Sequence, residues 1–78
     1  MNDLIIKKRI IYHLSLIQDQ PSQPVDVKSF TLMLEVASGG EMRTTQDVDS
    51  AFFELCEKRQ ALGLSFVELT NYIKYGVH

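Results

Sequence analysis

The chain has 78 residues, 45% of them hydrophobic, and this size and composition indicate one globular domain and exclude a disordered chain. Eight basic and ten acidic residues give a net charge of −2, which is too small to attract nucleic acid or a membrane surface by overall charge. The single cysteine, Cys56, excludes an internal disulfide and favours a cytoplasmic location. No apolar run approaches the ~18 residues of a membrane-spanning helix, so we expect no membrane contact.

The first predicted helix covers roughly residues 3–18. Apolar residues recur along it at helical spacing and predict a buried stripe. This stripe contains Leu4, Ile6, Ile10, Ile11, Leu14 and Ile17. Pro21 and Pro24, set among short polar residues, predict a flexible linker after the helix. The linker is too short to separate two domains, so we expect a single domain over residues 1–78.

The second predicted helix covers residues 27–38. Asp26 is the expected N-cap, and Val25 and Phe30 stand at the positions of a hydrophobic staple. Gly39 follows the last helical residue and favours a left-handed C-cap. The expected core residues of this helix are Phe30, Met33, Leu34 and Ala37.

The third and fourth predicted helices cover roughly residues 45–62 and 66–75. Thr44 or Thr45 caps the third helix and Gly63 ends it, while Ser65 and Glu68 match a capping box at the start of the fourth. The fourth helix is expected to end before Gly76. The expected core residues are Val48, Ala51, Phe52, Leu55 and Leu62 in the third helix and Phe66, Leu69, Tyr72 and Ile73 in the fourth. The pattern predicts an all-α, small four-helix bundle-like domain with short loops.

The residues that most often carry catalysis or bind metals are few and isolated. His13 has no acidic residue three or four positions away and is interpreted as a half-exposed rim residue, while His78 is terminal. Cys56 lies one position beyond the expected core stripe, and Glu57 beside it disfavours a thiolate. We therefore expect no enzyme activity, no cofactor and no metal site.

Aromatic side chains left outside the predicted core favour a protein-binding function. Phe53 directly follows Phe52, so it points about 100° away from it on a helix. Tyr75 lies at the end of the fourth helix, and exposed aromatic residues are enriched at protein interfaces. The expected protein-binding residues are Asp47, Asp49, Phe53, Glu54, Glu57 and Tyr75. We expect a small regulator, adaptor or inhibitor that binds another protein through this surface.

The one basic cluster is Lys7, Lys8 and Arg9, beside Tyr12. It is a candidate contact for nucleic acid or for an acidic partner. Together with the acidic third helix it gives the chain two patches of opposite charge, from which we expect a homodimer. The alternative function is a small dimeric transcriptional regulator that binds DNA. Its phosphate contacts would be Lys7, Lys8, Arg9, Lys58 and Arg59.

Residues 55–69 resemble the opening of the helix-turn-helix domains of phage-type repressors. The shared pattern is a basic helix followed by Gly63-Leu64-Ser65 and, after three residues, Leu69. The resemblance implies DNA binding, but no recognition helix is predicted after the fourth helix. We interpret the pattern as the capping chemistry of a helix that starts after a glycine, and we assign no family.

Overall fold

The computed structural model describes residues 2–18 and 25–75, and this part of the chain forms four α-helices and no β-strand. The helices are α1 (Asn2–Leu16), α2 (Val27–Ser38), α3 (Thr45–Leu62) and α4 (Phe66–Tyr75). The predicted all-α fold class is confirmed, and the bounds of α2, α3 and α4 match the predicted ranges. The predicted linker around Pro21 and Pro24, the helix end at Gly76, and His78 lie outside the described residues.

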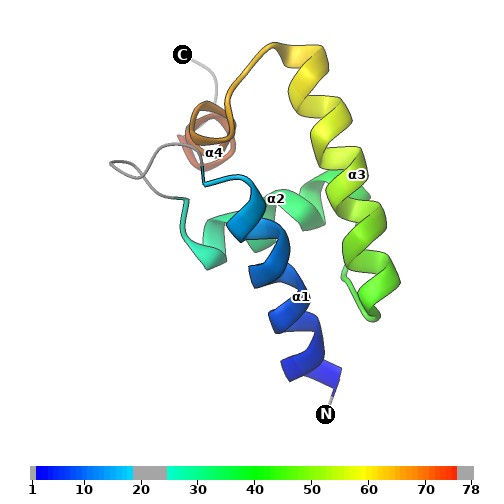
Figure 1. Ribbon diagram of the computed structural model, residues 1–78. Helices are drawn as coiled ribbons and strands as arrows, with labels where there is room; N and C mark the ends of the chain where they lie inside the picture. Colours follow the sequence, from blue (N-terminus) through cyan, green and yellow to red (C-terminus); the bar gives the residue numbers. More distant parts are fainter. Residues whose placement is uncertain (1, 19–24, 76–78) are drawn as a thin grey trace.

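The helix α2 is the central element of the fold. Figure 1 shows α1 and α3 side by side, with α2 crossing them. The helix α4 lies near the end of α2 where α2 begins. The helix α2 contacts each of the other three, most extensively α3, whereas α4 packs mainly against α2. One core therefore forms around α2, and each of its neighbours leaves its outer side exposed.

Two capping boxes set where α3 and α4 begin. The Asp47 backbone N–H donates to Thr44 Oγ1 at 3.1 Å, and the Thr44 N–H donates to Asp47 Oδ2 at 3.0 Å. In the same way the Glu68 N–H donates to Ser65 Oγ at 3.1 Å, and the Ser65 N–H donates to Glu68 Oε1 at 2.8 Å. These bonds satisfy donors that no helical carbonyl reaches, so the predicted starts are confirmed.

Local interactions also determine where α2 begins and where α2 and α3 end. Asp26 caps α2 by accepting the Ser29 N–H. Gly39 and Gly63 have φ of +79° and +69°, the left-handed conformation in which a helix ends. Only glycine adopts this conformation at little cost, and this explains why both helices stop where the sequence predicts.

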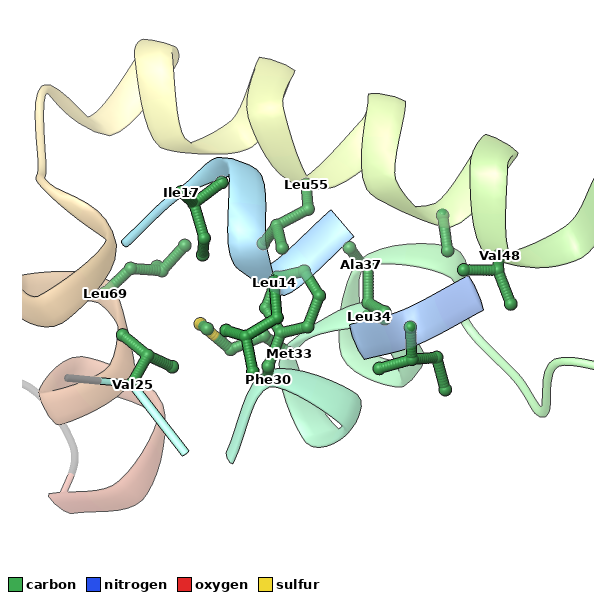
Figure 2. Close-up of a cluster of buried hydrophobic side chains, with 12 residues drawn as sticks. Leu14, Ile17, Val25, Phe30, Met33, Leu34, Ala37, Val48, Leu55 and Leu69 are labelled. Carbon is green, nitrogen blue, oxygen red and sulfur yellow. The ribbon is translucent and has the colours of Figure 1, made fainter. Parts of the chain in front are cut away.

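The hydrophobic core combines residues of all four helices with Ile17, just after α1, and Val25, just before the N-cap of α2 (Figure 2). Phe30 and Leu34 from α2 and Val48 and Ala51 from α3 are fully buried. The core consists of Ile10, Leu14, Ile17, Val25, Phe30, Met33, Leu34, Ala37, Val48, Ala51, Leu55 and Leu69. Every core residue predicted for α2 is confirmed, and Phe52, Phe66 and Ile73 are partly buried against this cluster.

Four residues predicted for the core are exposed instead. They are Leu4, Ile11, Leu62 and Tyr72. Leu4 lies in the first turn of α1, which extends past the crossing with α2, and Leu62 is the last residue of α3. Both side chains lie at a helix end, where they stay more than half exposed. Ile11 follows the buried Ile10 and points away from it around the helix.

Candidate protein-binding surface on α3

The outer side of α3 carries the candidate surface. The buried residues Val48, Ala51 and Leu55 turn one side of this helix toward the core. Residues on the other side line a shallow hollow of about 540 Å³. We call these residues the Phe53 face: Asp49, Ser50, Phe53, Glu54 and Glu57. All of them belong to α3, so a single rigid helix presents the surface.

Phe53 is the apolar centre of this face. Its exposed fraction is 64%, so the predicted exposure is confirmed. The preceding Phe52 turns inward, where its ring stacks on His13 at a centroid distance of 4.4 Å and meets the edge of Phe30 at 6.2 Å. The two consecutive phenylalanines therefore point in different directions, as the helical geometry requires. An exposed aromatic ring on a regular helix is a typical anchor of a protein interface.

Asp49, one of the expected protein-binding residues, has its charge paired within the molecule. Arg9 donates from Nε to Oδ1 at 2.8 Å and from Nη2 to Oδ2 at 2.9 Å, and His13 Nε2 lies 2.7 Å from Oδ1. Hydrogen bonds lower the pKa of Asp49 to about 2, and the bond from Arg9 has a larger effect than the bond from His13. Asp49 therefore links α3 to α1, and its charge is largely neutralised for a partner.

Asp47, another of the expected protein-binding residues, holds the start of α3 in place. Its carboxylate accepts the backbone N–H of Arg43 at 2.9 Å as well as that of Thr44. These bonds, of which the one from Arg43 has the largest effect, hold the pKa of Asp47 below its ordinary value. Glu54 and Glu57 are exposed and belong to no ion pair within the described residues. They are therefore the acidic residues of the Phe53 face whose charges stay unpaired in the described part of the chain.

His13 is buried, with an exposed fraction of 8%, so the prediction of a half-exposed rim residue is wrong. Its partners lie on another helix: the Asp49 carboxylate accepts a hydrogen bond from Nε2 at 2.7 Å, and Phe52 covers one ring face. The other ring nitrogen, Nδ1, is buried and has no hydrogen-bond partner among residues 2–18 and 25–75. The sequence showed no acidic neighbour because Asp49 lies 36 positions away.

Tyr75 is 66% exposed, as predicted, but it does not line the hollow beside Phe53. The helix that carries it, α4, packs mainly against α2, and the Lys74 ammonium lies 5.8 Å from the centre of the Tyr75 ring. The prediction of one surface that includes both aromatic residues is therefore not supported by the packing. The Phe53 face and the end of α4 are separate features.

The predicted basic patch on α1 is smaller than its sequence indicates. Lys7 and Lys8 are exposed, but Arg9 is partly buried in its pair with Asp49, which raises the pKa of its guanidinium. Arg59, another expected phosphate contact, donates to the Leu64 carbonyl at 3.0 Å and lies 5.0 Å from the centre of the Phe66 ring. Two of the five cations of the alternative DNA-binding surface thus have partners inside the molecule.

A second basic feature was missed because its lysines lie far apart in the sequence. A hollow of about 800 Å³ is lined by residues of α1, of α2 and its N-cap, and of α4. We call it the lysine groove. Its lining residues are Lys7, Asp26, Val27, Lys28, Ser29, Thr31, Leu32, Glu35 and Lys74. Only the packing of three helices brings Lys7, Lys28 and Lys74 to one place.

Other chemical groups in the described part of the chain form no further site. Cys56 is partly buried, and this burial raises the pKa of its thiol. Residues 2–18 and 25–75 hold no group of three His, Cys, Asp or Glu side chains that could bind a metal ion. None of the helices formed by these residues is long and apolar enough to cross a membrane.

Comparison of the chain with protein-family models, with curated proteins and with solved structures gives no match. The surface chemistry of the chain itself therefore supplies the basis for a functional hypothesis.

Proposed function

We propose that this protein acts by binding another protein through the Phe53 face. The observation that carries the proposal is the 64% exposure of Phe53 on the outer side of α3. Folding gains nothing from an aromatic ring that stays in water, whereas its burial in a partner contributes roughly 1.5–3 kcal/mol. Glu54 and Glu57 line the same hollow as the ring and favour a partner whose surface is apolar where it meets Phe53 and basic beside that point.

A protein of this kind is a small regulator, adaptor or inhibitor that occupies a surface of its partner. We place it in the cytoplasm, in keeping with its single cysteine. We also propose that copies of the chain associate, with a homodimer as the smallest assembly, because acidic and basic surfaces occur on one molecule.

Capture from native cells tests the binding function. A tagged chain should retain a specific protein, and Phe53→Ala should lose it while keeping the same thermal unfolding curve. Leu62→Ala is the matched control, because it removes an exposed apolar side chain from the same helix outside the Phe53 face. If Phe53→Ala retains the same protein as the unmodified chain, the Phe53 face is not its binding site.

DNA binding has less support, because Arg9 and Arg59 already donate within the molecule. The remaining Lys7, Lys8 and Lys58 would contact too few phosphates for tight binding at physiological salt. We expect the protein to pass through a heparin column at ~150 mM salt. Retention that Lys7→Glu with Lys8→Glu abolishes would instead favour DNA. These two variants leave the Arg9–Asp49 pair intact.

A further inference from the structure

The lysine groove combines an apolar lining with a positive rim. Val27 and Leu32 from α2 supply apolar surface, and Leu32 is exposed there. Lys7, Lys28 and Lys74 contribute three positive charges against the carboxylates of Asp26 and Glu35. The start of α2 adds the positive end of the helix dipole. The groove thus suits an apolar side chain flanked by acidic residues.

The Phe53 face has this chemistry. It presents an exposed aromatic ring beside Glu54 and Glu57, neither of which is engaged in an ion pair in the described part of the chain. We infer that the Phe53 face of one copy docks into the lysine groove of a second copy. The inference rests on the proposed function of the Phe53 face as a protein-binding surface, and it names the partner. The ring meets Val27 and Leu32, and the two glutamates meet the lysine rim.

The packing of α2 against α3 determines the symmetry of this contact. The two helices bury their facing sides against each other, and the groove and the Phe53 face use their outer sides. The two surfaces therefore lie on different sides of the molecule, and the contact is heterologous. Each added copy leaves one groove and one Phe53 face open. The proposed homodimer is thus the first step of a head-to-tail series.

Sedimentation of charge-reversed variants tests this contact. At ~50 mM salt the unmodified chain should associate as its concentration rises, and its average mass should pass that of a dimer, while ~500 mM salt should weaken the association. One variant carries Glu54→Lys and Glu57→Lys, and the other carries Lys28→Glu and Lys74→Glu. Each alone should associate at least ~10-fold more weakly, because like charges then face each other.

An equal mixture of the two variants is the decisive measurement. The acidic groove of one variant then matches the basic Phe53 face of the other, so the mixture should recover association that neither variant shows alone. Circular dichroism of each variant establishes that it is folded. A chain that stays monomeric at all concentrations, or a mixture that stays as weak as its components, would overturn the inference.

The outcomes also separate this inference from the proposed function. A dimer that Phe53→Ala disrupts, but that stops at two copies and tolerates Lys28→Glu with Lys74→Glu, would mean that the Phe53 face pairs with itself. In that case the groove is not its partner, although the face still binds protein. If Phe53→Ala changes neither the association of copies nor the capture of a cellular protein, the proposed function fails as well.

Discussion

The side chain of Asp49 joins α1 to α3. It accepts two hydrogen bonds from Arg9 and contacts His13, so its replacement removes a charge-assisted network between two helices. Its side chain is 43% exposed, and solvent screening reduces the effect. We expect Asp49→Asn to lower the free energy of unfolding by about 1 kcal/mol, measured by urea denaturation. Glu54→Gln, on the same helix without an ion pair, should change it by less than ~0.5 kcal/mol.

The same carboxylate predicts a specific dependence of stability on pH. The pKa of Asp49 is lowered from 3.8 to about 2 in the folded chain, so the ionised form favours folding. This contribution is present above the unfolded pKa and is lost as the pH falls through the folded pKa. The difference in unfolding free energy between the unmodified chain and Asp49→Asn should be largest above about pH 5 and shrink toward pH 2. A difference that stays constant over this range would mean that the bridge does not depend on the charge of Asp49.

The environments of some residues at the candidate sites could be predicted from the sequence, and those of others could not. The exposure of Phe53 follows from its position beside Phe52 on a helix, so it could be predicted. The burial of His13 and the pairing of Arg9 could not, because both depend on Asp49, about forty positions further along the chain. The lysine groove was missed for the same reason. Side chains from three helices meet only after the chain has folded.

At the scale of the helix, the ends are the best predicted features, because capping is a local interaction. Gly63 gives a direct test, since its φ of +69° strains any other residue. We expect Gly63→Ala to lower the free energy of unfolding by about 1 kcal/mol. Gly40 is the control, because it has no positive φ and its Cβ would meet nothing within 4 Å. If Gly63→Ala costs no more than Gly40→Ala, the left-handed conformation of Gly63 adds no strain and the C-cap does not require glycine.

The same helices show where local patterns lose their predictive value. Apolar spacing identified the whole buried stripe of α2, because neighbours cover this helix along its length. On α1 and α3 the spacing predicted burial for three residues that are exposed, namely Leu4, Ile11 and Leu62. Periodicity reports which side of a helix is apolar, but how far that side is covered depends on where the crossing helix lies.

At the scale of the whole molecule, one core around α2 should make the four helices unfold together. Leu34 and Leu62 were both predicted core leucines, yet Leu34 is fully buried in α2 and Leu62 is 51% exposed at the end of α3. Leu34→Ala leaves a cavity next to residues of the other helices and should cost roughly 3–5 kcal/mol. Leu62→Ala creates no cavity and should cost less than ~1 kcal/mol.

Thermal unfolding followed by circular dichroism and by tyrosine fluorescence measures both effects. In Leu34→Ala the two probes should shift together to lower temperature, because Tyr12 lies on α1 and Tyr72 and Tyr75 lie on α4, and both helices pack against α2. Separate transitions for the two probes would mean that α1 or α4 folds independently of the core. Such independence would also weaken the lysine groove as a docking site, because Lys7, Lys28 and Lys74 keep their positions only while α1, α2 and α4 stay packed.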